Sequence, residues 1–325
     1  MTNLKEKKVS PVVHFVAGGT GATAGALLTA PLEIIKTRLQ ASRVPHMQLA
    51  VSQPTVISLA GGNVTQALPF SQGKQGVVMH LRLIVQSEGL RALWKGIGPY
   101  LIGVAPARSV YFATYATSKK YFNSKLKPES SVVHMLSASI GGAVAVTSTC
   151  PIWVIKTRLQ LDTKRTNFKS GLLCAKNIYA TDGIRGFYRG LSASYVGIGE
   201  TVLQFVIYER LKKTLKQNRD SFTQQKSYKD FTECIIAAAG SKFIASGLTY
   251  PHEVVRTRLR EKFDGPRQYR SFVQTLLKVW REEGRPGLYG GMNAHLIRVI
   301  PNTVSMMLVY ELVVYAISNR DITSY

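Results

Sequence analysis

Four ionisable side chains interrupt stretches of the chain that are otherwise apolar: Arg108, Glu200, Lys242 and Arg298. A single charge at the centre of a lipid bilayer costs about 2.5–3.5 kcal/mol on insertion scales, so we expect these side chains to face a shared aqueous cavity. Three of the four are cationic, which favours a ligand with several negative charges, such as a phosphate ester. The plainer interpretation is that they pair with one another or extend to the membrane surface, and only hold helices together.

Other polar and small residues near these charges are candidates for contacts with the rest of such a ligand. Glu200 and Gln204 lie a helical turn apart, and together they offer acceptors and a donor for the edge of a base or sugar. Gly103, Gly197 and Gly199 would let a ring approach the helix backbone. Glu200 could instead only neutralise one of the cations.

Six stretches of the sequence are long and apolar enough to cross a membrane. Residues 12–30 and 132–155 contain no Asp, Glu, Lys or Arg, and both exceed the roughly 18 residues that a span needs. The other four are long enough only if one ionisable residue is allowed near the middle of each: 97–118, 191–208, 234–252 and 292–310. Shorter amphipathic stretches, typical of helices on a membrane surface, lie at 76–87, 171–180 and 272–281. Glycines predict close packing of two spans: Gly18, Gly19, Gly21, Gly25, Gly141 and Gly142.

The sequence repeats itself three times. PLEIIKTRLQ (31–40), PIWVIKTRLQ (151–160) and PHEVVRTRLR (251–260) precede the boxes EGLRALWKG (88–96), DGIRGFYRG (182–190) and EGRPGLYGG (283–291). Ordered pairs of boxes at this period indicate tandem structural repeats with two spans each. We place the repeats at residues 10–125, 130–217 and 230–319, together forming one transport domain. The first repeat carries an insertion at about residues 41–73, whose Ser, Gln, Gly and Pro content predicts a loop.

Composition narrows the class of protein. Lysine and arginine number 42 against 18 acidic residues, a formal net charge of +24, which suits a partner such as nucleic acid, an anionic membrane surface or an anionic substrate. A basic nucleic-acid-binding protein would be soluble, and the charge-free stretches argue against that. Three widely separated cysteines exclude a disulfide framework and zinc spacing. Scattered histidines without a nucleophile motif argue against an enzyme.

With these motifs in view, the chain resembles the mitochondrial carrier family over nearly its whole length. The family signature is Pro-x-[Asp/Glu]-x-x-[Lys/Arg]-x-[Lys/Arg], three times, each followed by an acidic-Gly box that ends in aromatic-[Lys/Arg]-Gly. The resemblance implies an all-α membrane protein of six transmembrane helices with threefold pseudosymmetry, short matrix-side helices, and a place in the mitochondrial inner membrane. It also implies kinks at Pro31, Pro151 and Pro251, because proline removes a helix hydrogen bond.

The resemblance further implies a matrix gate made by the signature charges. Glu33 would pair with Lys156, and Glu253 with Lys36. The remaining members are Trp153, Arg256 and the bracing glutamines Gln40 and Gln160.

The third pair of this gate is broken. Trp153 replaces the acid that would face Arg256, and we expect its ring to stack on the guanidinium instead. Arg260 departs from the bracing glutamines of the other two repeats.

An opposite, cytoplasmic gate is implied by aromatic-[Asp/Glu]-x-x-[Lys/Arg] motifs near the ends of the even helices. Ala116 and Val314 break this pattern, so only the pair Glu311–Lys119 is complete and the matrix gate is expected to be the stronger. The residues that match are Tyr115, Lys119, Tyr208, Glu209, Lys212, Tyr310 and Glu311.

Within the family, the chain is most similar to the pyrimidine nucleotide carriers. It shares their PIWVIKTRLQ, GVAPARSVYFATY and PHEVVRTRLRE segments and their long first-repeat loop. This resemblance implies transport of pyrimidine nucleotides and deoxynucleotides of the UTP, CTP and TTP class. The implied mechanism is alternating-access exchange, with uniport as a further option. The implied contact points are Gly103, Gly197, Ile198 and Arg298. The alternative is a carrier of another phosphorylated cofactor: FAD, folate, NAD or thiamine diphosphate.

The expected partners follow from this assignment. They are nucleotide substrates and membrane lipid, with cardiolipin at the matrix side. The protein is expected to act as a monomer, to bind no nucleic acid, metal or cofactor, and to catalyse no reaction.

Overall fold

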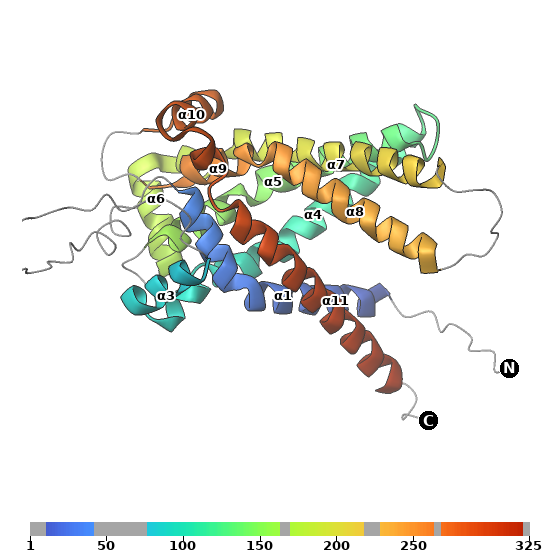
Figure 1. Ribbon diagram of the computed structural model, residues 1–325, viewed down its shortest axis with the longest axis horizontal. Helices are drawn as coiled ribbons and strands as arrows, with labels where there is room; N and C mark the ends of the chain where they lie inside the picture. Colours follow the sequence, from blue (N-terminus) through green and yellow to red (C-terminus); the bar gives the residue numbers. More distant parts are fainter. Residues whose placement is uncertain (1–10, 42–76, 163–169, 218–227, 263–267, 321–325) are drawn as a thin grey trace, which may run out of the picture. The chain divides into compact units, whose positions relative to one another are not determined.

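The computed structural model describes residues 11–41, 77–162, 170–217, 228–262 and 268–320, and every regular element in these ranges is a helix (Figure 1). The predicted loop insertion therefore lies, apart from Ala41, outside the described residues. In chain order the elements are α1 (Pro11–Gln40), α3 (Val77–Glu88), the 3-10 helix η1 (Leu90–Trp94), α4 (Ile97–Asn123), α5 (Ser131–Leu161), α6 (Ser170–Gly186), α7 (Leu191–Gln217), α8 (Tyr228–Thr249), α9 (Pro251–Arg260), α10 (Phe272–Leu288) and α11 (Met292–Arg320).

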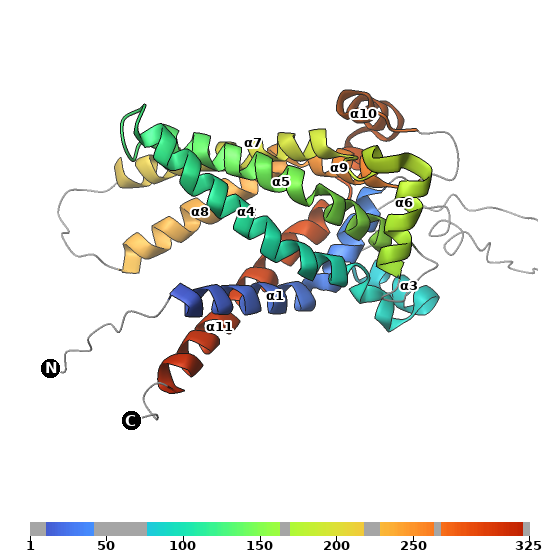
Figure 2. The same cartoon turned by 180° about the vertical axis from the view of Figure 1, so that it is seen from behind.

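The chain forms two compact units. The first contains α1, α3, η1 and nearly all of α11, and the second contains α4 to α10. Within the second unit, α4 lies beside α5, and α7 beside α8 (Figure 2). Long helices cover five of the predicted spans, and α8 together with the start of α9 covers the sixth, 234–252. The short helices α3, α6 and α10 cover the described part of the predicted surface stretches, so the all-α expectation is confirmed.

Among the described helices, one is by itself long and apolar enough to be a candidate membrane span: α5 (Ser131–Leu161), with a mean hydropathy of 1.5. A second candidate is the pair Gly171–Gly186 and Leu191–Leu211, which is bent by 70°. A bend of that size turns α6 across the direction of α7, as expected for a surface helix that leads into a span.

The signature prolines act differently in the three repeats. Pro31 and Pro151 lie inside α1 and α5, whereas Pro251 is the first residue of the separate helix α9. Figure 1 shows α1 changing direction along its length. Inside α1 and α5, proline removes one backbone hydrogen bond of the helix. In the third repeat the single residue Tyr250, whose backbone angles are helical, separates α8 from α9, and Pro251 stands at the first helical position, where its missing N–H removes no hydrogen bond of α9.

Each repeat has two glycines at equivalent positions of its box, six in all. The first follows the acid of each box, and the second closes the box before the next long helix. All six have positive φ, a conformation that glycine adopts without the steric cost that other residues carry. They are Gly89, Gly183 and Gly284 (φ 83°, 61° and 64°), and Gly96, Gly190 and Gly291 (φ 80°, 74° and 76°).

A buried ion pair joins the two boxes of the first repeat. Arg38 binds Glu88 with both terminal nitrogens, Nη1 to Oε1 at 2.6 Å and Nη2 to Oε2 at 3.0 Å. Lys95 Nζ lies 2.6 Å from Glu88 Oε2, and all three side chains are almost fully buried. We call each such pairing of a signature arginine with a box acid a clamp.

The second unit contains two equivalent clamps. Arg158 Nη2 lies 3.1 Å from Asp182 Oδ2, and Arg189 Nη2 lies 2.8 Å from Asp182 Oδ1. In the third repeat, Arg258 binds both oxygens of Glu283, with Nη2 to Oε2 at 2.7 Å.

The third clamp lacks its second cation. Gly290 stands where the other repeats have Lys95 and Arg189, and among the described residues only Arg258 pairs with Glu283. Arg258 also donates to the hydroxyl of Tyr269 at 3.1 Å.

One apolar cluster lies beside each clamp. Each cluster includes the residue four positions before the acid, together with residues of the signature segment of the same repeat. The residues four positions before the acids are Ile84, Ile178 and Val279, and none is more than 1% exposed. Ile84 packs on Ile34 and Ile35, Ile178 on Cys150 and Val154, and Val279 on Val255 and Leu259.

Glycines let α1 approach α11 within the first unit. A Cβ added at Gly21 would lie 2.6 Å from Met306 O, and one at Gly25 would lie 2.9 Å from Asn302 O. The predicted close packing is thus confirmed at these two positions, and also at Gly141 in the second unit, where an added Cβ would lie 3.1 Å from Tyr111 O. At Gly18 and Gly19 it is wrong within the described residues, because an added Cβ would meet no atom within 4 Å.

This contrast predicts the effect of adding one methyl group. Gly21→Ala should lower the free energy of unfolding by about 1–3 kcal/mol, because the methyl group would meet a backbone carbonyl that cannot rotate away. Gly19→Ala is the matched control, since it has the same gain in helix propensity and no clash. Thermal unfolding in detergent measures both variants. Equal melting temperatures would show that α1 and α11 do not pack closely at Gly21.

The first clamp predicts a pH dependence of stability. Burial alone would raise the pKa of the Glu88 carboxyl, but hydrogen bonds from Arg38 and Lys95 outweigh burial and hold that pKa below its ordinary value of 4.5. A carboxyl whose pKa is lower in the folded state stabilises the fold above its unfolded-state pKa, and this stabilisation is lost as pH falls through the folded-state pKa. Glu88→Gln should therefore melt lower than wild type at neutral pH and lose less on acidification. If the melting temperatures of the wild type and Glu88→Gln differed by the same amount at every pH, the Glu88 carboxyl would not be charged in the clamp.

Candidate substrate-binding site and gates

Two of the four predicted mid-span charges meet in the second unit. Glu200 on α7 accepts hydrogen bonds through one oxygen, Oε1, from Lys242 Nζ and from Ser246 Oγ on α8, each at 2.8 Å. Lys242 and Ser246 are four residues apart and so lie on one face of α8. The side chain of Lys242 is 43% exposed and that of Glu200 15%. The pair is direct and partly shielded from solvent.

Ser246 was not predicted as a site residue. The only sequence signal for it is its spacing of four residues from Lys242, which places a hydroxyl beside a cation on one helix face.

The other predicted polar residues have no such pairing. Arg108 is exposed on α4, and Gln204 is half-buried on α7, one turn from Glu200. Neither makes a side-chain hydrogen bond within the described ranges. Arg298, on α11 of the first unit, has its Nε buried with no hydrogen-bond partner among the described residues. A buried donor without a partner costs about 1–3 kcal/mol, so a ligand that binds it gains affinity.

The predicted contact points at small residues lie at contacts between helices. A Cβ at Gly103 would lie 2.9 Å from Cγ2 of Ile152, and one at Gly197 would lie 2.7 Å from Nε2 of His252. Ile198 lies against Gly142 of α5. In this structure these residues set the spacing of helices within the second unit, and their contact with substrate stays a prediction. Gly199 has open space around it.

Trp153 packs differently from our expectation. Its ring meets Tyr100 edge to face, with centroids 5.8 Å apart, and Lys156 Nζ lies 4.2 Å from the Tyr100 centroid and 5.2 Å from the Trp153 centroid. The indole nitrogen donates to Thr149 Oγ1 at 2.9 Å. The expected stacking on Arg256 is wrong, because that guanidinium binds Glu253 of its own helix at 2.9 Å.

The predicted matrix-gate pairs join residues of different units. Glu33 and Lys36 belong to the first unit, and Lys156 and Glu253 to the second, so both pairs stay predictions. The bracing residues Gln40 and Gln160 are buried.

Arg260 takes the place of the third bracing glutamine. It is also buried, and it donates to Ser194 Oγ on α7 at 3.2 Å. Its own backbone carbonyl accepts a hydrogen bond from Arg158 Nε at 3.1 Å. The Arg260 side chain thus joins α9 to α7, and its backbone carbonyl, which any residue would provide, joins α9 to α5.

A polar cluster lies where α4 turns into α5. Glu129 Oε2 is 2.9 Å from Lys119 Nζ and 3.3 Å from His134 Nε2, and Nδ1 of His134 is 2.6 Å from the hydroxyl of Tyr115. The hydrogen bond from Lys119 lowers the pKa of the Glu129 carboxyl below its ordinary value. Glu129 has a φ of 55°, and Asn123 holds it there by accepting from its backbone N–H at 3.1 Å.

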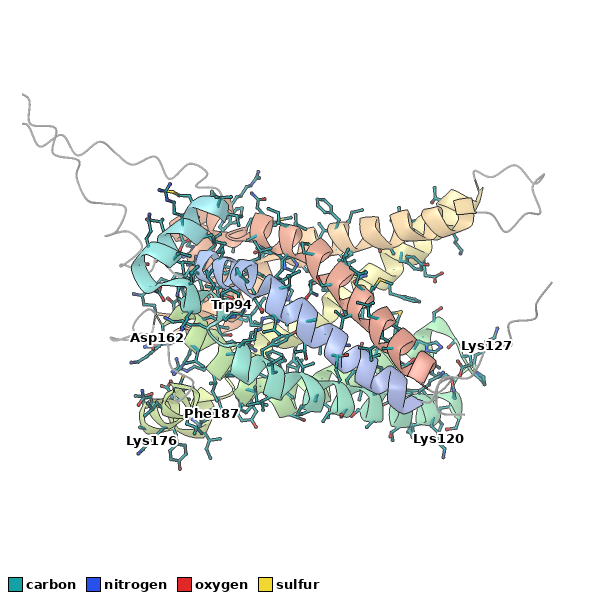
Figure 3. All side chains as sticks on the ribbon, turned by 90° about the horizontal axis from the view of Figure 1, so that it is seen from below. Trp94, Lys120, Lys127, Asp162, Lys176 and Phe187 are labelled. Atoms are coloured by element: carbon teal, nitrogen blue, oxygen red, sulfur yellow. The ribbon has the colours of Figure 1, made fainter. Side chains whose placement is uncertain are left out.

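Two predicted cytoplasmic-gate residues, Tyr115 and Lys119, therefore belong to this cluster. The predicted partner of Lys119, Glu311, is in the first unit and its side chain is outside the described part, as is that of Lys212. Tyr208 and Tyr310 are half-buried and Glu209 is exposed. Figure 3 labels Lys120 and Lys127 at this end of the second unit, and Asp162, Lys176 and Phe187 at the opposite end.

Comparison with known proteins agrees with this arrangement. The family described as "Mitochondrial carrier protein" matches three consecutive segments, residues 7–126, 127–219 and 227–321. Solute carrier family 25 member 36-A of Danio rerio is 49% identical over 315 residues, which cover 94% of this chain and 98% of that protein. Solute carrier family 25 member 33 of Homo sapiens is 44% identical over 322 residues, 97% of this chain and 98% of that protein.

A fungal relative carries a more specific name. The mitochondrial pyrimidine nucleotide transporter RIM2 of Saccharomyces cerevisiae is 37% identical over 349 residues, 97% of this chain and 90% of that protein. Three tandem family matches, three clamps and six equivalent glycines repeat together along the chain. The chain belongs to the mitochondrial carrier family, multi-pass transport proteins of the mitochondrial inner membrane.

Proposed function

We propose that the protein carries pyrimidine nucleotides and deoxynucleotides of the UTP, CTP and TTP class across the mitochondrial inner membrane. The observation that carries this proposal is the likeness, over 97% of the chain, to a yeast protein named as a pyrimidine nucleotide transporter. Lys242 and Arg298 support it, because cations inside otherwise apolar helices suit a phosphorylated substrate.

We assign the phosphates to Lys242, Arg298 and Arg108, and the base or sugar to Glu200 and Gln204. Gly103, Gly197 and Ile198 complete the proposed contacts. Substrate binding shifts the balance between two gated states only if its affinity for those states differs. In the proposed exchange, the ion pairs Glu33–Lys156 and Glu253–Lys36 close the matrix side, and Glu311–Lys119 closes the cytoplasmic side.

We further propose that the protein is a monomeric carrier without enzymatic activity, built from repeats at residues 10–125, 130–217 and 230–319. Apolar side chains stand exposed on all three surface helices: Val78 at 80%, Leu172 at 84% and Val273 at 61%. Exposed apolar residues on amphipathic helices suit insertion into the membrane surface. This supports the proposed contact of these helices with lipid, with cardiolipin as the matrix-side lipid.

Transport in liposomes tests the substrate class. Purified protein in vesicles preloaded with UTP should take up labelled UTP, and unlabelled CTP or TTP should compete better than ATP or FAD. The competing proposal is a carrier of FAD, folate, NAD or thiamine diphosphate. If any of these competed with labelled UTP better than CTP did, that proposal would replace ours.

Arg298 should be required for uptake. Arg298→Ala should lower UTP uptake by at least about tenfold, the loss of one hydrogen bond to a charged group. Arg298→Lys should recover part of it, since lysine keeps the charge but not the planar pair of donors. Arg91→Ala is the control, because Arg91 is exposed on η1 of the same unit. Wild-type uptake by a folded Arg298→Ala variant would remove this residue from the site.

A further inference from the structure

We propose that Ser246 and Lys242 form a phosphate subsite, and that the carboxylate of Glu200 fills it while the carrier is empty. The inference rests on the proposed function. It adds Ser246 as a binding residue and gives a reason why the carrier should distinguish phosphates by their charge.

The geometry around Glu200 is that of an anion site. Two donors of different kinds, the ammonium of Lys242 and the hydroxyl of Ser246, converge on the single oxygen Oε1, each at 2.8 Å. A phosphate oxygen can accept hydrogen bonds from the same two donors, and a phosphate group carries more negative charge than a carboxylate. The other carboxylate oxygen makes no hydrogen bond within the described residues. The carboxylate is therefore held at one atom only, as a displaceable group would be.

The exposed fractions of these side chains indicate the order in which an incoming phosphate contacts them. Lys242 is 43% exposed at its side chain, Glu200 15%, and Ser246 only 4% as a residue. An incoming phosphate can meet Lys242 directly, but it reaches the Ser246 hydroxyl only after the Glu200 side chain has moved. Like charges disfavour each other at short range, so the phosphate itself drives the carboxylate away from Lys242. The displaced carboxylate then faces the base or sugar, the contact proposed for Glu200 above.

The empty carrier needs this substitute anion. Lys242 lies in an otherwise apolar stretch and is only partly exposed, so a counter-charge stabilises it, and the Glu200–Lys242 pair holds α7 against α8 until another anion binds. Because the entering group must replace a carboxylate of charge −1, a triphosphate displaces it more readily than a monophosphate. Glu200 thus makes the carrier selective for highly charged phosphates.

The simpler view is that Glu200 and Lys242 only hold two helices together. The two views differ in their outcome when the charge of Glu200 is removed. In the wild type, the KM for UMP should be higher than the KM for UTP. In Glu200→Gln, the KM for UMP divided by the KM for UTP should be at least about fivefold smaller than in the wild type, because a neutral amide competes weakly with either nucleotide. For a purely structural pair, both KM values would change together and the ratio would stay constant, which would overturn the proposal.

Ser246 gives a second, independent arm. Ser246→Ala should raise the KM for UTP by about tenfold, through the loss of one hydrogen bond to a charged group. The matched control is Ser241→Ala, on the same helix and fully buried, whose hydroxyl donates to Ala238 O instead. It should leave the KM unchanged. Equal KM values for the two serine variants would exclude Ser246 from the site.

Inorganic pyrophosphate separates the subsite from the substrate assignment. Bound pyrophosphate should raise the melting temperature of the wild type and of Ser241→Ala, and much less that of Ser246→Ala. If wild-type vesicles took up no UTP, the proposed function would fail, while this thermal shift would still test the subsite. If pyrophosphate stabilised all three proteins equally, or none of them, the subsite would be wrong whatever the transported nucleotide.

Discussion

A buried arginine bound to a carboxylate ties the signature segment of each repeat to its surface helix. Arg38–Glu88, Arg158–Asp182 and Arg258–Glu283 repeat this arrangement. Removing one partner of a buried pair costs about 3–5 kcal/mol, because the other charge is left without compensation. The clamps therefore fix the C-terminal ends of α1, α5 and α9, and with them the backbone that carries the proposed matrix gate. The residues proposed for the matrix gate are not members of these clamps.

Much of this fold could be predicted from the sequence because its signals are local or repeated. Apolar length located the long helices, and the box glycines fall at the same backbone position in all three repeats. The effect of the prolines could not be predicted in full. Pro151 and Pro251 occupy the same place in their motifs, yet only the second begins a separate helix. The difference is local, because Tyr250 before α9 still has helical backbone angles (φ −48°, ψ −37°), and a shared motif does not resolve a change of one residue.

The sequence identified unusual polar residues within apolar stretches, but it did not predict their contacts. Lys242 and Glu200 stood out as charges within apolar stretches, but their meeting depends on the rotation of α7 and α8 about their axes. Trp153 was identified as unusual, and its partner Tyr100 lies on another helix and carries no motif. Glu129 was missed because it lies in a turn with positive φ, where helical periodicity gives no guidance.

Gly290 makes the threefold repeat chemically unequal. In the first two repeats a second cation shares the box carboxylate, whereas among the described residues Glu283 pairs with Arg258, which also donates to the neutral hydroxyl of Tyr269. A helix anchored by one cation loses fewer ion pairs when it detaches than a helix anchored by two. We therefore expect α10 to open locally before α3 and α6 when the protein is heated.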